Sequence, residues 1–338
     1  MIKVGSDFSG VGAFDYAIKR VNKNVETVFA CDWDNYARQS YVACHGEPKY
    51  YPKDVYEREI PKESLDIYMT SPPCQAFSLA GKRKGKADKR GILFFNSLEF
   101  IQVNKPRYFI FENVKGLLSD DGGNTFQEWV NYLGGKSVNG SPVLFPSENS
   151  VPYNLYYKVL NSKKHGVPQN RERIFLVGIR DDIDNDFSFP KEEHLKLRLK
   201  DILEDQVDEK YFLSKKAITR FTNHDRSIGF KDPENYNVAN CLISGYSKMP
   251  GDGLYLKIKS NTVKGVAQTL DTQCNQGVIK DFRIRKLTPL ECFRLQDFPD
   301  SHVQKCIDAG VSNSQLYKQA GNSITVRVLE LIIKKLKL

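Results

Sequence analysis

The chain has 338 residues, enough for two domains and a sizeable buried core. Its 40% hydrophobic and 27% charged content is that of an ordinary globular protein, and no apolar run reaches the about 20 residues of a membrane helix. The seven cysteines form no C-x-x-C pair, so neither a disulfide framework nor a zinc site is indicated. The amino terminus enters a strand at once, without signal-peptide anatomy, and we expect a cytoplasmic protein with reduced thiols.

From the amino terminus to about residue 183, short apolar strands alternate with helical stretches. Strands are predicted around Val4 and over 28–31, 67–69, 109–111 and 174–178. Such alternation predicts a doubly wound α/β sheet. The intervening helices are predicted over 13–21, 35–44, 93–103 and 125–133.

The alternation is lost over 184–284, where charges mix with β-branched residues, aromatic residues and turn signals. We expect a smaller, irregular and mainly β domain there. Helical spacing returns from Asn322 to the end of the chain. The first domain, 1–183, would then be completed by 312–338, with 285–311 as a hinge and return segment.

A thiol and a carboxylate each close an apolar stretch. Cys74 follows two prolines after the predicted strand 67–69, and Glu112 ends the predicted strand 109–111. Side chains at the carboxyl ends of neighbouring parallel strands share one crevice, so the two would lie together. Such a pair suits attack on an electron-poor ring that is protonated as it is attacked. Taken alone, a cysteine such as Cys74 is more often a buried core residue, and a glutamate such as Glu112 is often only a helix cap.

The net charge of +9 concentrates directly after Cys74. Between Cys74 and Leu93, basic residues far outnumber the single acidic residue, Asp88, and three glycines interrupt the run. A solvated surface loop would explain a charge run of this kind. Its place beside the candidate nucleophile favours a mobile lid that closes over a polyanion. The basic residues are Lys82, Arg83, Lys84, Lys86, Lys89 and Arg90.

A glycine-containing turn, Phe-Ser-Gly-Val-Gly at 8–12, follows the first strand and precedes a helix. Glycines there let a ligand approach the backbone at the amino terminus of the helix. Asp32 and Trp33 end the second strand, where a carboxylate can bind ribose hydroxyls and an indole can stack on adenine; Asp54-Val55 could serve the next strand end similarly. The third glycine of the dinucleotide fingerprint is absent, so the pattern favours S-adenosylmethionine over a dinucleotide.

The chain resembles the DNA (cytosine-5)-methyltransferases, of bacterial or phage type, over nearly its whole length and least within 184–284. Six sequence blocks stand in the order of that family. The resemblance implies a Rossmann-like S-adenosylmethionine-dependent methyltransferase sheet, a target recognition domain at 184–284, and double-stranded DNA as substrate. The blocks are FSGVG at 8–12, PCQ at 73–75, ENV at 112–114, QNRER at 169–173, RKLTPLEC at 285–292 and QAGNS at 319–323.

By this resemblance, Cys74 adds to carbon 6 of a cytosine flipped out of the duplex, and Glu112 contacts the ring nitrogen and exocyclic amine. Arg173 would hold the carbonyl oxygen of the base, and Arg171 would organise the closed loop. The residues implied to line the cofactor pocket are Phe8, Gly10, Val11, Gly12, Asp32, Trp33, Asp54, Val55, Pro73, Leu93, Asn322 and Ser323. Those expected to contact DNA are Gln75, Ser78, Lys82, Arg83, Lys84, Lys86, Arg90 and Thr269.

Two positions depart from the family pattern. Ser6 stands where the first block commonly has an acidic residue, with Asp7 beside it, so that acidic role is not carried over. Ala13 replaces the usual last glycine of the block, which is a small change. We expect a monomer whose partners are duplex DNA and, if it belongs to a restriction-modification pair, an endonuclease acting on the same site.

Three other functions stay open at this point. An RNA cytosine-5 methyltransferase is one, but the tRNA-modifying branch of the family carries Cys-Phe-Thr in its recognition region, whereas this chain has Cys-Phe-Arg at 292–294 in a later block. A catalytically silent DNA-binding relative would lack Cys74, Glu112 or Arg173, and all three are present. An NAD-dependent oxidoreductase is disfavoured by the glycine pattern and by the lack of a catalytic His or Lys near the strand ends.

Overall fold

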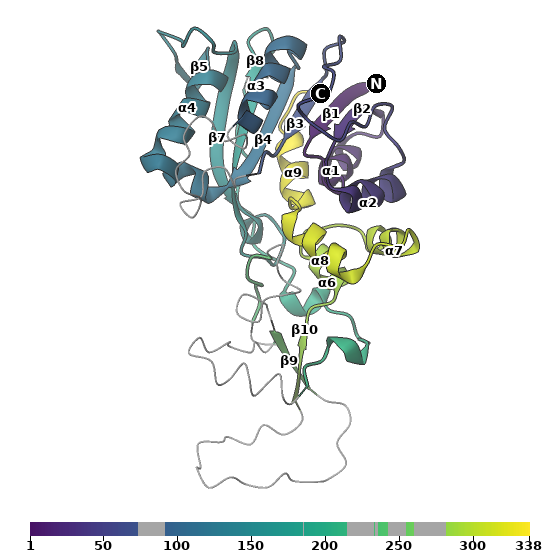
Figure 1. Cartoon of the computed structure of the whole chain (residues 1–338). Helices are drawn as coiled ribbons and strands as arrows, with labels where there is room; N and C mark the ends of the chain where they lie inside the picture. Colours follow the sequence, from purple (N-terminus) through teal and green to yellow (C-terminus); the bar gives the residue numbers. More distant parts are fainter. Residues whose placement is uncertain (74–91, 185, 215–232, 234–235, 243–254, 260–281) are drawn as a thin grey trace, which may run out of the picture.

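The fold is taken from a computed structural model, which describes residues 1–73, 92–184, 186–214, 233, 236–242, 255–259 and 282–338. A sheet of eight strands forms the centre of the larger part, in the order β2-β1-β3-β4-β8-β7-β5-β6 (Figure 1). The strands are β1 (Ile2–Asp7), β2 (Val25–Cys31), β3 (Ile67–Thr70), β4 (Tyr108–Val114), β5 (Ser137–Val138), β6 (Ser141–Pro142), β7 (Tyr153–Asn161) and β8 (Glu172–Arg180).

Strands β1 to β4 are parallel, which confirms the α/β sheet predicted from the alternation. β1 lies between β2 and β3, so the winding of the chain reverses there. In open sheets of this kind, ligands bind outside the carboxyl ends of the strands at that reversal. β8 pairs antiparallel with both β4 and β7, a direction that the sequence pattern did not predict. Because of that direction, β8 begins beside the end of β4.

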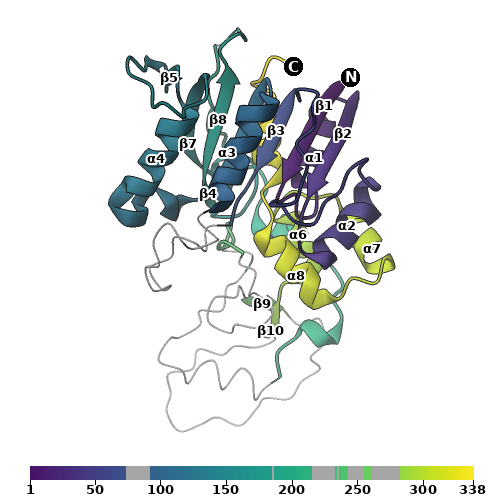
Figure 2. The same ribbon diagram turned by 45° about the horizontal axis from the view of Figure 1, so that its top comes forward.

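Helices cover both faces of the sheet (Figure 2). α1 (Ala13–Val21) packs with α9 (Val326–Ile333) on one face, and α3 (Ile92–Asn104) and α4 (Asn124–Leu133) lie on the other. The period-two alternation of the strands separates two cores. Ile67 and Met69 join the core under α1 and α9, whereas Tyr68 joins the aromatic core under α3 and α4.

The predicted helices over 13–21, 35–44, 93–103 and 125–133 agree with α1, α2 (Asn35–His45), α3 and α4 to within a residue at each end. Local capping explains the start of α2, where the Asp34 carboxylate accepts from the backbone N–H groups of Tyr36 and Ala37.

The carboxyl-terminal tail differs from its prediction as one helical stretch from Asn322. Instead, α8 (Asn313–Asn322) ends there, and α9 starts only after an extended connection. Thr325 holds that connection in place, since its Oγ1 donates to Gln296 Oε1 at 2.9 Å and lies 2.9 Å from Ser162 Oγ. Side-chain hydrogen bonds to buried neighbours therefore override the local helical pattern.

The smaller part contains β9 (Tyr255–Lys259), paired antiparallel with β10 (Phe282–Lys286). The helix α6 (Pro289–Arg294) follows, and α7 (Asp300–Asp308) packs against α2 of the larger part. Figures 1 and 2 place β9, β10 and α6 beyond the end of the sheet at which β1, β3 and β4 finish. Much of 184–284 lies outside the described residues, so the domain bounds stay a prediction. Of the helices in the described ranges, none is long and apolar enough to cross a membrane.

Candidate active site

An acid–base pair lies where β4 and β8 meet. In the antiparallel register Glu112 faces Phe175 and Val114 faces Arg173, which brings Glu112 and Arg173 to the same sheet face. Glu112 Oε1 lies 3.1 Å from Arg173 Nε, and the two side chains are only 9% and 17% exposed. Burial raises the pKa of Glu112 above its usual value, although Arg173 and Arg171 act against this shift. The site thus makes this carboxyl group easier to protonate than an exposed glutamate.

Asn113 ties the end of β4 to the segment that follows β3. Its side chain is buried; Nδ2 donates to the carbonyl oxygen of Pro72 at 3.1 Å, and Oδ1 accepts from Val114 N at 2.8 Å. This contact fixes the backbone two residues before Cys74. Asn113 was not among the predicted site residues, although the Glu-Asn-Val block contained it.

The predicted nucleophile and DNA contacts fall on segments that the structure does not describe. Pro73, which is exposed, is the last described residue before them. The residues concerned are Cys74, Gln75, Ser78, Lys82, Arg83, Lys84, Lys86, Arg90 and Thr269.

Arg171 is 2% exposed and binds backbone carbonyls from two distant segments. Its guanidinium donates to Leu242 O at 2.9 Å, to Gly321 O at 3.1 Å and to Ser323 O at 2.6 Å. Burial is the main reason that the pKa of Arg171 falls to about 10. Arg171 therefore joins the start of β8 to the α8–α9 connection and to the 184–284 region. Its predicted part in organising the closed loop stays a prediction.

The glycine turn after β1 leaves room for a ligand. Phe8 and Gly10 have positive φ angles of 56° and 55°, and a Cβ atom on Gly10 would meet no atom within 4 Å. Asp32 Oδ2 accepts from the backbone N–H of Gly10 at 2.7 Å, which links the ends of β1 and β2. Ser9 Oγ is buried in this turn and interacts with the Tyr51 hydroxyl.

Trp33 is the most conspicuous side chain of this region, because it is 84% exposed although it is large and apolar. An exposed indole beside an open glycine turn and a carboxylate fits the adenosine part of S-adenosylmethionine. Asp54 and Val55 lie in the connection between α2 and β3, so the prediction that they end a strand was wrong. Asp54 and Asn322 are exposed, Leu93 is half-buried at the start of α3, and Val55 and Ser323 are buried.

Asp7 forms a buried ion pair. It stands next to Ser6, the position where the family commonly has an acidic residue. Its carboxylate lies 2.9 Å from Arg58 Nε and accepts from the Tyr68 hydroxyl at 2.6 Å. The Asp7 and Arg58 side chains are 0% and 2% exposed. Since successive strand residues point to opposite faces, Asp7 cannot replace the acid absent at Ser6.

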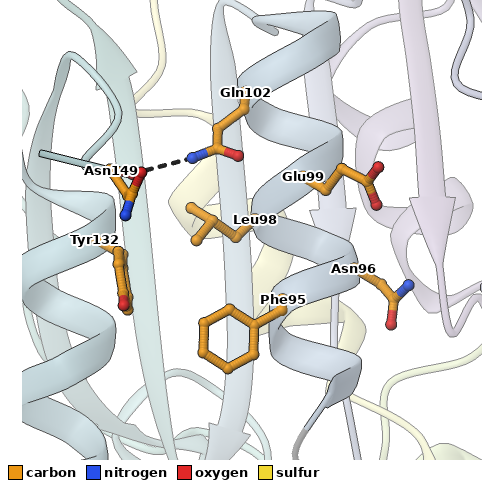
Figure 3. A pocket seen from close by; sticks show the side chains of 7 residues that line it. All are labelled: Phe95, Asn96, Leu98, Glu99, Gln102, Tyr132 and Asn149. Carbon is orange, nitrogen blue, oxygen red and sulfur yellow. Dashed lines mark hydrogen bonds between the residues drawn. The ribbon is translucent and has the colours of Figure 1, made fainter.

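The surface of the described part also has two hollows. One of about 370 Å³ lies between α3 and α4, where Gln102 Nε2 donates to Asn149 O at 3.0 Å (Figure 3). The other, of about 420 Å³, is lined mainly by α2. No predicted site residue lines either one. The first is lined by Phe95, Asn96, Leu98, Glu99, Gln102, Tyr132 and Asn149.

Comparison with known proteins agrees with this geometry. The family model described as C-5 cytosine-specific DNA methylase matches residues 2–338, and the chain belongs to that family. The chain is 32% identical to the orphan methyltransferase M.SPRI of Bacillus phage SPR, covering 99% of this chain and 97% of the relative. It is 34% identical to the type II methyltransferase M.HpaII of Haemophilus parainfluenzae, covering 97% and 87%.

A solved structure shares the fold. The S. pombe Dnmt2 methyltransferase superposes with a TM-score of 0.74 at 22% identity, covering 99% of this chain and 98% of that one. Family membership makes the protein a DNA (cytosine-5)-methyltransferase that uses S-adenosylmethionine.

Proposed function

We propose that the protein methylates cytosine within a specific sequence of double-stranded DNA, by flipping the base and forming a covalent adduct with Cys74. The observation that carries the proposal is the buried Glu112–Arg173 pair, 3.1 Å apart, beside the Pro72 carbonyl that Asn113 holds. A cytosine inside a duplex cannot present its face to such a site, so the base must leave the stack, at a cost of a few kcal/mol.

In the proposed reaction the Cys74 thiolate forms a bond to carbon 6 of cytosine. The electrons of the carbon 5–carbon 6 double bond then make carbon 5 nucleophilic. Glu112, whose raised pKa favours a shared proton, neutralises the negative charge that develops at the ring nitrogen. Arg173 binds the carbonyl oxygen and orients Glu112. After carbon 5 has gained the methyl group it gives its proton to water, and the electrons of that bond restore the carbon 5–carbon 6 double bond. The bond between carbon 6 and sulfur breaks in the same step, and its electrons restore the thiolate.

S-adenosylmethionine, when bound, supplies the methyl group as an electrophile on its sulfonium. The residues proposed to hold it are those of the glycine turn, Asp32 and Trp33. The Asp32 carboxylate already orders the turn through Gly10, and the exposed Trp33 ring offers a stacking face.

The basic run after Cys74 is proposed as the part that closes on the phosphates, because it carries most of the excess positive charge of the chain. We propose that 184–284 reads the target sequence. M.SPRI is named an orphan methyltransferase and M.HpaII a type II methyltransferase, so relatives of both kinds are known. Bisulfite sequencing of DNA from expressing cells identifies the methylated sequence.

The test of the mechanism is Cys74→Ser, with Cys292→Ser as the matched control at a buried cysteine outside the predicted site. We expect Cys74→Ser to abolish methyl transfer to duplex DNA while calorimetry still detects S-adenosylmethionine binding. A duplex with fluorine at carbon 5 of the target cytosine should form a stable adduct with the control only, because fluorine cannot leave as a proton does. Substantial turnover by Cys74→Ser would refute the nucleophile, and methylation of tRNA in place of duplex DNA would refute the substrate.

A further inference from the structure

Two thiols and an imidazole lie close together between α2 and α7, next to Tyr16 of α1. Cys44 lies in the last turn of α2, and His302 and Cys306 stand one turn apart on the same side of α7. In the described part of the chain this is the one group of His, Cys, Asp or Glu donors gathered closely enough for a metal; its donor atoms lie within 4.8 Å of one another. None of the predicted catalytic residues belongs to it.

We propose that Cys44, His302 and Cys306 form a zinc site that fastens α2 to α7. The Sγ atoms of Cys44 and Cys306 are 3.8 Å apart, and Cys306 Sγ is 3.7 Å from His302 Nε2. Tetrahedral zinc with bonds of about 2.3 Å to sulfur and 2.0 Å to nitrogen sets two sulfur ligands about 3.8 Å apart and a sulfur and a nitrogen about 3.5 Å apart. The two distances at Cys306 therefore match those of a zinc site, and all three donor atoms lie within 4.8 Å of one another.

The surroundings orient the imidazole for this task. His302 Nδ1 lies 3.2 Å from the Tyr16 hydroxyl, which directs Nε2 toward Cys306. A hydrogen bond on the second ring nitrogen is the usual companion of a zinc-bound histidine. The rings of Phe293 and Phe298 pack at 4.8 Å and 4.7 Å and restrict rotation of the imidazole.

Burial distinguishes the two sides of the site. His302 and Cys306 are fully buried, whereas Cys44 is half-buried, so an ion can enter from the Cys44 side and keep water as its fourth ligand. Soft thiolate ligands with an imidazole favour zinc over magnesium or calcium. The spacing of the donors in the sequence conceals the site, since Cys44 and Cys306 are 262 positions apart.

The experiment measures zinc in the full-length protein after reduction, incubation with zinc chloride and desalting. We expect about one zinc per chain, as three protein ligands and water bind one ion, in the wild type and in the control Cys292→Ala. Cys44→Ser and Cys306→Ser should fall to background. Zinc should raise the Tm of the wild type and leave that of both serine variants unchanged, since it binds only the folded site.

Two further measurements decide the matter if a serine variant folds poorly. Cobalt(II) added to the wild type should give a thiolate-to-metal charge-transfer band, and Tyr16→Phe should weaken zinc affinity by about 10- to 100-fold. Absence of zinc and of the cobalt band in the wild type would overturn the proposal. Zinc content in Cys306→Ser equal to that of the wild type would also overturn it. A disulfide between the two cysteines is the remaining alternative; it would show as an intact mass lighter by two hydrogens before reduction, together with no metal uptake after reduction.

Discussion

Replacing Arg171 tests how much the fold gains when one buried guanidinium joins the start of β8 to the connection between α8 and α9. Arg171→Ala leaves the carbonyls of Leu242, Gly321 and Ser323 without their donor. An unsatisfied buried carbonyl costs about 1–3 kcal/mol, so three cost roughly 6 kcal/mol. Against this, the variant no longer buries a charge, and the fall of the Arg171 pKa to about 10 corresponds to roughly 3 kcal/mol. We therefore expect the free energy of unfolding to drop by about 3 kcal/mol.

Urea unfolding measures this loss, with Arg107→Ala as the control. Arg107 forms a half-exposed ion pair with Asp66 at 3.1 Å, and its loss should cost less than about 1 kcal/mol. Arg171→Lys should recover only part of the stability, because one ammonium cannot reach three carbonyls set in different directions. S-adenosylmethionine should also bind Arg171→Ala more weakly, since Ser323 adjoins the predicted pocket. An Arg171→Ala variant as stable as the control would refute the reasoning.

Three other predictions concern the catalytic edge. Burial raises the folded-state pKa of Glu112 above 4.5, so the stability of the wild type relative to Glu112→Gln should be highest below about pH 4.5 and decline as pH rises. Urea unfolding over pH 4–8 measures this difference in stability. A difference that does not depend on pH would contradict the shift. Asn113→Ala should lower kcat for methyl transfer by at least about tenfold, since it frees the backbone before Cys74, while cofactor affinity stays unchanged; an unaltered kcat would remove the tether from the mechanism. The triple variant Lys82→Ala, Arg83→Ala and Lys84→Ala, in the basic run, should bind DNA more weakly and with a flatter salt dependence. A salt slope equal to that of the wild type would exclude these residues from the DNA interface.

Much of the parallel sheet could be predicted from the sequence. The apolar stretches that became β1 to β4 and the helices α1 to α4 have periodicities that depend only on neighbouring residues, so local pattern suffices to locate them. The placement of Glu112 at a strand end followed from the same pattern. Family resemblance added the order of the blocks, and the match over 2–338 agrees with it.

Strand direction could not be predicted in this way, because an apolar stretch has the same pattern whether it runs up or down a sheet. β8 runs against β4, and only that direction brings Arg173 within 3.1 Å of Glu112. The break between α8 and α9 likewise depends on Gln296 and Ser162, which are distant in the sequence.

The sequence by itself determined the family and the cofactor, since these depend on ordered sequence blocks, and it predicted the reactive pair Cys74 and Glu112. Tertiary structure alone decided that Glu112 is buried against Arg173, that Asn113 holds Pro72, and that Asp7 is committed to Arg58. It also brought Cys44 to Cys306 and His302. These contacts join residues tens to hundreds of positions apart, and their energies come from desolvation and geometry that arise only when the chain is packed.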